Sequence, residues 1–169
     1  MNRIKNCFVI EWKGPFYDID EIRNEDFENS FYLITGKVKN QRTESCIQYC
    51  GISKKRSVFK RLLDKDHKHN SIKENDKQIW IGQFSNSKNN LYKYIELAEH
   101  LIIFYWKPGL NDKKIENPPK EPIGIINRWL STTGNYRKNR IYPAQHLDDV
   151  ILYDGETFWA TNKLYEVVI

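Results

Sequence analysis

Four side chains in the middle of the chain have the chemistry that is needed to cut a phosphodiester bond. Tyr32 and Tyr49 lie in two short runs of β-prone residues, Arg61 follows in an amphipathic segment, and Glu99 lies in a later one. A tyrosine, with a pKa near roughly 10, is a weak base that needs a nearby cation to take a proton at neutral pH. An arginine can bind a phosphate bidentately and stabilise the charge that builds up during attack. A carboxylate can hold a divalent cation, so the set suits metal-dependent phosphodiester hydrolysis.

Helix geometry separates Glu99 from the other acids near it. Apolar residues recur at helical spacing between Asn90 and Trp106, which predicts an amphipathic helix. At about 100° per residue the apolar stripe centres near Ala98, Glu99 lies on its border, and Glu96 and His100 point to the far side. Glu99 is therefore the acid that can reach a cleft, where it could ligate one Mg²⁺ or Mn²⁺ whose other ligands are waters and substrate phosphate.

Five pieces of the chain, four of which carry these residues, occur in a fixed order. They are Phe31-Tyr32-Leu33-Ile34-Thr35, then Gln48-Tyr49-Cys50-Gly51-Ile52-Ser53, then Arg61, then Ala98-Glu99-His100-Leu101-Ile102, and finally Pro108-Gly109-Leu110-Asn111. Together they resemble the GIY-YIG nuclease family over roughly residues 30 to 112. The chain departs from the family pattern at scaffold positions: Ser30 and Phe31 replace the opening glycine and isoleucine of the first motif, and Cys50 replaces the middle isoleucine of the second.

The resemblance implies an α/β (α+β) fold in which a small three-stranded antiparallel sheet is flanked by helices. It also implies hydrolysis of DNA with one divalent ion, Mg²⁺ or Mn²⁺, leaving 5′-phosphate and 3′-hydroxyl ends. In that reaction, water is activated near Tyr32 or Tyr49, Arg61 stabilises the transition state, and Glu99 holds the metal. Arg56 is an alternative to Arg61, because the gap after Gly51 is slightly longer than is typical of the family.

Other residues receive supporting roles. Asn111 matches the asparagine that closes the family pattern, and it is expected to order the glutamate end of the site through hydrogen bonds. His67 and His69 follow the arginine segment, where relatives often carry a histidine that relays a proton or contacts phosphate; the alternative is a solvated loop. The candidate cations beside the tyrosines are Lys37, Lys54 and Lys55.

Periodicity and turn signals predict the elements that position these residues. Residues 31–38 and 46–51 are expected to form an antiparallel hairpin, Ser57 to cap a helix through Leu63, and residues 78–82 to form a third strand. Outside this core, residues 8–12 are predicted as a strand stopped by Gly14-Pro15, and 123–130 as a short helix. Residues 150–153, 157–160 and 164–168 alternate like a small β-meander. The expected organisation is one domain, with an N-terminal extension (1–29), a nuclease-like core (30–112) and a C-terminal extension (113–169).

Composition and charge suit a nucleic-acid partner. The chain has 169 residues, 40% of them apolar, and a net charge of +5, which favours a folded single domain with a polyanionic ligand. A basic loop, Tyr136, Arg137, Lys138 and Arg140, precedes the meander and is expected to contact a phosphate backbone and a sugar or base. The alternative is a solvated loop, in which case Lys39 to Arg42 and Lys65 to Lys73 are the next candidate surfaces.

Several other classes of protein are disfavoured. The longest apolar run, Leu101 to Trp106, is far shorter than a membrane span, and acidic residues interrupt the N-terminus, so a soluble cytoplasmic protein without a membrane partner is expected. Three cysteines without a CxxC pair predict reduced thiols rather than disulfides or a structural zinc.

The sequence leaves two rival functions open. One is a nucleic-acid-binding module that has lost cleavage, against which the presence of both Arg61 and Glu99 argues. The other is a repair or recombination nuclease subunit that needs a partner. Since no separate DNA-binding domain is recognisable, target choice must come from loops, extensions, homodimerisation or a protein partner.

Overall fold

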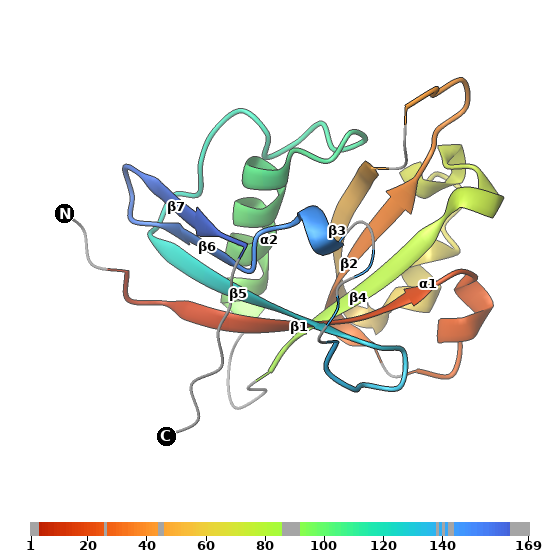
Figure 1. Cartoon of the computed structure of the whole chain (residues 1–169), viewed down its shortest axis with the longest axis horizontal. Helices are drawn as coiled ribbons and strands as arrows, with labels where there is room; N and C mark the ends of the chain where they lie inside the picture. The colour runs from red at the N-terminus through yellow and green to blue at the C-terminus, as the bar shows by residue number, and fades with distance from the viewer. Residues whose placement is uncertain are drawn as a thin grey trace.

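Seven strands form one mixed sheet with a helix on each face (Figure 1) in the computed structural model, which describes residues 4–25, 27–43, 46–85, 92–137, 139, 141 and 144–162. The strands are β1 (Cys7–Phe16), β2 (Glu28–Gly36), β3 (Cys46–Ser57), β4 (Gln78–Phe84), β5 (Ile123–Leu130), β6 (Val150–Tyr153) and β7 (Phe158–Thr161). The helices are α1 (Val58–Leu62) and α2 (Tyr92–Trp106), with short 3-10 turns η1 (Ile19–Ile22), η2 (Lys68–Ser71), η3 (Glu74–Asp76) and η4 (Ala144–His146).

The prediction of an α+β class is confirmed, but that of a three-stranded sheet is wrong. The expected antiparallel set β3-β2-β4 is present, and the full order continues as β3-β2-β4-β1-β5-β6-β7. The sheet continues past β4 because the N-terminal strand β1 pairs antiparallel with it and parallel with β5. The two terminal segments are therefore strands of the same sheet, and β1 is one of its interior strands.

Two predictions for the terminal segments are also wrong. Strand β1 runs through Gly14-Pro15 to Phe16, and a register shift between Lys13 and Phe16 accommodates the glycine and proline. Residues 123–130 form a strand instead of a helix, because Gly124 to Leu130 pair with β1 and Ile123 to Ile126 also pair with β6. Their buried residues show the alternation of a strand in this setting, with Asn127 accepting a 2.8 Å hydrogen bond from the indole N–H of Trp12.

The remaining elements largely agree with their predictions. The hairpin of β2 and β3 is formed, and the Ser57 hydroxyl caps α1 by accepting from the Lys60 backbone N–H, although α1 is only five residues long. Strands β6 and β7 pair across a turn in which the Asp154 carboxylate accepts from the N–H groups of Glu156 and Thr157. The third meander segment, 164–168, lies outside the described residues.

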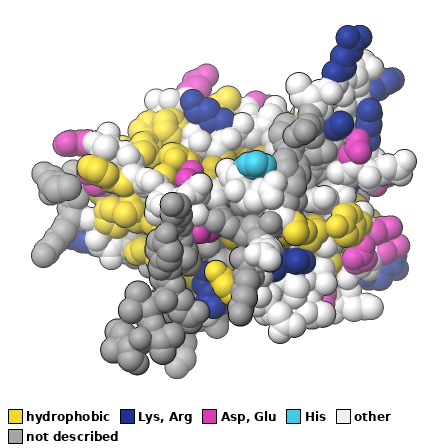
Figure 2. All heavy atoms as spheres, in the orientation of Figure 1, with side chains coloured by type: hydrophobic (Ala, Val, Ile, Leu, Met, Phe, Trp, Pro, Cys, Tyr) yellow, Lys and Arg dark blue, Asp and Glu magenta, His cyan; other side chains and the backbone are white. Residues whose placement is uncertain are grey.

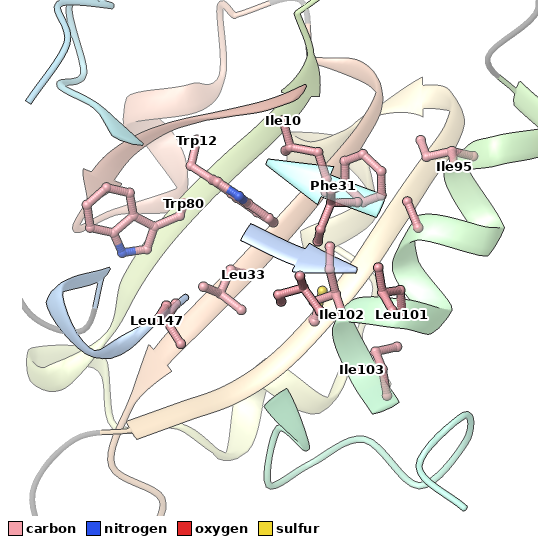
Figure 3. Packing of buried hydrophobic residues seen from close by; sticks show 14 of the residues in the cluster. Ile10, Trp12, Phe31, Leu33, Trp80, Ile95, Leu101, Ile102, Ile103 and Leu147 are labelled. Atoms are coloured by element: carbon pink, nitrogen blue, oxygen red, sulfur yellow. The ribbon is translucent and has the colours of Figure 1, made fainter. Parts of the chain in front are cut away.

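The two faces of the sheet carry separate apolar clusters. On β2, Phe31 and Leu33 belong to the cluster under α2, while Tyr32 and Ile34 belong to the cluster under α1, as the two-residue period of a strand requires. Figure 3 shows α2 applied to the first face, with Leu101 and Ile102 directed at the strands. Tyr32 therefore lies on the face of the sheet opposite to the one that α2 covers.

Two smaller expectations can be compared with the structure. Cys50 is a buried free thiol as expected, whereas the free thiol of Cys7 is exposed, and the side chain of Cys46 lies outside the described set. Within the described part of the chain, no helix is long and apolar enough to cross a membrane.

Candidate active site

Tyr32 and Tyr49 lie together on the α1 face because strands β2 and β3 place them in neighbouring pairs. Tyr32 is opposite Gly51, Tyr49 is opposite Ile34, and the two phenol rings stack with centroids 5.9 Å apart. A Cβ atom at Gly51 would lie 2.6 Å from the Tyr32 hydroxyl and 2.8 Å from the Tyr49 ring. The Tyr32 ring thus passes over Gly51, which brings its hydroxyl to the edge strand, and only glycine leaves room for this arrangement.

Burial governs the acidity of both phenols. It raises the pKa of Tyr32, and the neighbouring Tyr49 adds to the shift while Arg61 opposes it. It also raises the pKa of Tyr49, but there hydrogen bonding from Tyr32 acts in the opposite direction. Of the two oxygens, that of Tyr49 therefore receives a hydrogen bond that favours its ionised form.

His67 holds the Tyr32 hydroxyl, and its tautomer follows from its partners. The His67 Nδ1 atom accepts from the backbone N–H of His69 (3.1 Å), so the proton of the neutral ring is on Nε2. That Nε2 lies 2.9 Å from the Tyr32 hydroxyl oxygen, to which it must donate. Burial, reinforced by His69 and Arg61, lowers the pKa of His67 to about 3. His67 is thus a neutral donor that leaves the Tyr32 O–H free to donate elsewhere.

A second layer behind His67 contains a buried lysine. The Lys77 side chain is 1% exposed, and its Nζ lies 2.7 Å from Glu74 Oε1 and 3.3 Å from His69 Nδ1. Since an ammonium only donates, His69 accepts at Nδ1 and donates from Nε2 to the Leu62 carbonyl at 2.7 Å. This network fixes His69, whose backbone N–H in turn fixes His67.

Arg61 and Arg56 converge on one carboxylate at the start of the loop after α1. Asp64 accepts from Arg61 Nη1 at 2.5 Å and from both terminal nitrogens of Arg56 at 2.6 and 3.2 Å. Arg61 also interacts with Tyr32, and this, together with Asp64, raises the pKa of Arg61 although burial acts to lower it. Arg61, and not Arg56, is therefore the guanidinium beside the tyrosines.

Glu99 lies on α2 where helix geometry places it, at the border of the apolar face and only 8% exposed. Its Oε2 accepts from the Lys114 ammonium at 2.5 Å. Burial raises the pKa of Glu99, while Lys114 opposes that shift. One turn earlier, Glu96 points outward and pairs with Lys54.

Asn111 binds the edge strand rather than the glutamate. Its Oδ1 accepts from Cys50 N–H and its Nδ2 donates to Cys50 C=O, both at 2.9 Å. The backbone N–H groups of the two preceding residues, Gly109 and Leu110, donate to the carbonyls of Ile47 and Gln48, respectively. The segment after α2 therefore covers the outer edge of β3 as far as Cys50, and the cover ends one residue before Gly51.

These contacts bring most of the predicted residues to one place. Tyr32, Tyr49, Arg61 and His67 form a contact group on the α1 face. Glu99 belongs to the α2 face on the other side of β3, and it influences the group electrostatically by raising the pKa of Tyr49. The site thus spans the edge of the sheet at Gly51, with the phenols on one side and the carboxylate on the other.

The predicted lysine cations lie elsewhere. Lys54 forms its ion pair with Glu96, and the backbone N–H of Lys55 donates to Asn29 Oδ1, while the Lys55 side chain is exposed. The Lys37 carbonyl accepts from Lys73 N–H. None of these three is among the main contributors to the pKa shift of either tyrosine; Arg61 is the cation that acts on both.

A divalent ion at this site would have to take most of its ligands from water and substrate. Across the described residues, no three His, Cys, Asp or Glu side chains gather as a metal site would require. Glu99 is a buried carboxylate that already has a cation, Lys114, against it. A single carboxylate can be enough for Mg²⁺ when waters and substrate phosphate complete the shell, so Glu99 would bind such an ion weakly by itself and more tightly together with substrate.

The predicted C-terminal binding loop is only partly described. Tyr136 is 50% exposed, and the guanidinium of Arg128 lies over its ring. Arg137 donates to the carbonyls of Gly14 at 3.0 Å and Leu130 at 3.4 Å, so its guanidinium ties β1 to β5. Lys138 and Arg140 lie outside the described residues.

A basic surface lies closer to the contact group. The bridge between Val38 and Ile72 joins the β2–β3 loop to the segment between α1 and β4, which also carries His67. Its exposed basic side chains are Lys39, Arg42, Lys65, Lys68 and Lys73. Figure 2 shows basic side chains at the upper right of the molecule, where Figure 1 places these two segments.

Sequence reasoning missed Asp64, Lys77 and Lys114. Each is a charged residue in a stretch rich in charge, and nothing in its type or spacing distinguishes it from a solvated neighbour. Asp64 did carry one signal, because it lies three residues after Arg61, a spacing that favours ion pairs on a helix.

In comparisons with known proteins, no family model matches this chain, and neither does any curated protein or solved structure.

Gly51→Ala tests whether the glycine is needed for the two tyrosines. The added methyl overlaps both rings, so we expect the free energy of unfolding to fall by about 1–3 kcal/mol and the rings to shift. Chemical denaturation and tyrosine fluorescence measure these effects. Gly109→Ala is the control, because its methyl meets only the end of the Gln48 side chain at 3.1 Å. Equal stability of the two variants would contradict the packing argument.

His67→Gln tests the neutral state of the histidine. In the unfolded chain His67 titrates near roughly 6.5, but its pKa in the folded protein is about 3. Between these values the unfolded state binds the proton, so the stability present above pH 6.5 is lost as the pH falls. We expect the parent to lose about 2 kcal/mol more than His67→Gln between pH 7 and pH 5 in urea unfolding. The His100→Gln control should behave like the parent, and an unchanged pH dependence in His67→Gln would count against a buried neutral ring.

Proposed function

We propose that the protein is a metal-dependent DNA endonuclease of the GIY-YIG type, which hydrolyses phosphodiester bonds to 5′-phosphate and 3′-hydroxyl ends. The observation that carries this proposal is the convergence of Tyr32, Tyr49, Arg61 and His67 beside Gly51, with Glu99 across the edge strand. These residues come from β2, β3, α1, the loop before η2, and α2. A convergence of titratable groups with perturbed pKa values from separate elements is typical of a catalytic site.

Proton removal from the attacking water is assigned to Tyr49. His67 donates to the Tyr32 oxygen, and the Tyr32 hydroxyl favours the ionised form of Tyr49. Arg61 also stabilises that form. Tyr49 first releases its own proton to solvent; its phenolate then takes a proton from the attacking water, whose oxygen bonds to phosphorus, and the bond from phosphorus to the 3′ oxygen breaks as that oxygen takes a proton from a solvent water.

Arg61 holds the phosphate during this step. Its guanidinium lies beside Tyr32 and is one-third exposed, so a phosphate oxygen can reach it at the edge of the site. A fork of two N–H groups suits the equatorial oxygens, whose charge grows as attack proceeds.

Glu99 would hold the divalent ion. A Mg²⁺ or Mn²⁺ ion bound there supplies positive charge to the phosphate and to the leaving oxygen. Glu99 is rigidly placed by α2, whose apolar face is packed under the sheet. The carboxylate therefore has a fixed position relative to the tyrosines.

DNA is the proposed substrate because the exposed basic surface of Lys39, Arg42, Lys65, Lys68 and Lys73 adjoins the segment that carries His67. Neutralising phosphates with such residues releases counterions and gives salt-dependent binding. Selection of a particular sequence or structure would then depend on loops, on a second copy of the chain or on a protein partner.

A second candidate is a nucleic-acid-binding module without cleavage. The ion pair between Lys114 and Glu99 favours it, since that contact already neutralises the carboxylate. The two candidates differ in whether Glu99 is needed for a chemical step, so its substitution separates them.

Glu99→Gln should abolish Mg²⁺- or Mn²⁺-dependent cleavage of plasmid DNA while DNA affinity and fold stay close to those of the parent. The change removes a ligand charge with almost no change in volume. Glu96→Gln, one turn away on the exposed side, is the control and should cut like the parent. If purified Glu99→Gln cuts as fast as the parent, the assignment is wrong; if the parent binds DNA without cutting under any metal, the binding module is favoured.

Arg61→Ala should lower the single-turnover cleavage rate by about two or more orders of magnitude, corresponding to roughly 3 kcal/mol of transition-state stabilisation. Arg56→Ala is the matched control, because Arg56 shares the Asp64 carboxylate while Arg61 alone interacts with Tyr32. We expect its loss to stay under about tenfold. The reverse order of the two losses would transfer the phosphate clamp to Arg56.

A further inference from the structure

The carboxylate proposed to bind the metal is held by a lysine that lies outside the motifs of the active centre. Lys114 Nζ lies 2.5 Å from Glu99 Oε2, and the side chains of these two residues are 33% and 11% exposed. Lys114 follows the segment that Asn111 pins to the edge strand, and its backbone has φ 66°, a conformation that non-glycine residues rarely adopt. The loop is therefore fixed in a form that delivers an ammonium to Glu99.

The ammonium has a place to which it could withdraw. Lys114 lines a cavity of about 560 Å³ between α2 and the loop that follows it, together with Glu96, His100 and Lys120. Glu96, which pairs with Lys54, lies on the wall of this cavity, and Lys114 acts electrostatically on Glu96 as well as on Glu99. A rotation of the Lys114 side chain would thus move its ammonium from Glu99 toward Glu96.

We propose that Lys114 is a resident counter-ion of the metal site, which occupies Glu99 in the DNA-free protein and moves toward Glu96 when a divalent ion and phosphate bind. This inference rests on the proposed function, since it takes Glu99 to be the metal ligand. It makes Lys114 a positioning residue that weakens metal binding until substrate is present.

Charge balance is the physical reason for such a residue. A nearly buried carboxylate without a partner is costly, so a free protein that lacked both metal and Lys114 would be destabilised. A divalent ion and the ammonium compete for the same carboxylate, and substrate phosphate adds ligands that the ion otherwise takes from water. Lys114 therefore holds the Glu99 carboxylate in place without a metal, and couples metal binding to DNA binding.

The test is Mn²⁺ binding to the DNA-free protein at pH 8, followed through the electron paramagnetic resonance signal of free Mn²⁺. Lys114→Met removes the competing charge and keeps the apolar stem, and we expect the Mn²⁺ dissociation constant to fall by about tenfold or more. Lys114→Arg keeps a cation, and Lys120→Met removes a lysine from the same cavity without touching the ion pair. Both controls should bind Mn²⁺ like the parent.

The double variant Lys114→Met with Glu99→Gln identifies the ligand. The double variant should lose the higher Mn²⁺ affinity of Lys114→Met. If the higher affinity persists, Mn²⁺ binds elsewhere, and both the inference and the metal role of Glu99 are overturned. If Lys114→Met binds Mn²⁺ no tighter than the parent, although Glu99→Gln weakens binding, the role of Lys114 is refuted and the proposed function stands.

A second readout covers the case in which Lys114→Met folds poorly. Lys114→Gln is a polar alternative, and saturating Mn²⁺ should raise its melting temperature more than it raises that of the parent. Equal shifts in the two proteins would contradict competition between Lys114 and the metal.

Discussion

The arrangement of the site depends on the absence of a side chain at Gly51. Because nothing occupies that position on the edge strand β3, the rings of Tyr32 and Tyr49 can stack and the Tyr32 hydroxyl can reach the sheet edge. His67 then binds that hydroxyl, and Arg61 approaches it from α1. A methyl group at this one position would separate the phenols, and the contacts of the other groups are built on their location.

The edge strand explains why groups from opposite faces of the sheet can act together. Each interior strand of the sheet has a neighbouring strand on both sides, whereas β3 is the last strand of the order. Side chains of the two faces can therefore approach each other around the outer edge of β3, where residues 109–111 bind the stretch from Ile47 to Cys50. Across this edge, Glu99 on the α2 face acts electrostatically on Tyr49 on the α1 face.

Internal counter-ions are the second feature of the site. Asp64 holds two arginines and Lys114 holds Glu99, so the free protein neutralises both the group proposed to bind phosphate and the one proposed to bind metal. Partly buried charges need such partners. A metal ion is positive, like Lys114, and a phosphate is negative, like Asp64. Each ligand could therefore take the place of that internal partner without leaving Glu99 or Arg61 unpaired.

Short-range sequence patterns specify the local elements and the residue types of the site. Alternation placed Tyr32 and Tyr49 on strands, helical spacing put Glu99 at the border of the α2 stripe, and Ser57 marked the start of α1, because each of these follows from short-range periodicity or capping. Long-range contacts place β1 and β5 in a seven-stranded sheet, which local patterns do not reveal, because strand pairing between distant segments leaves no local signal and the pattern of Ile123 to Leu130 is compatible with a helix or a strand. Long-range contacts also decide that Asp64, Lys77 and Lys114 serve the site, because the partner of a charged side chain is set by which segments the fold brings together.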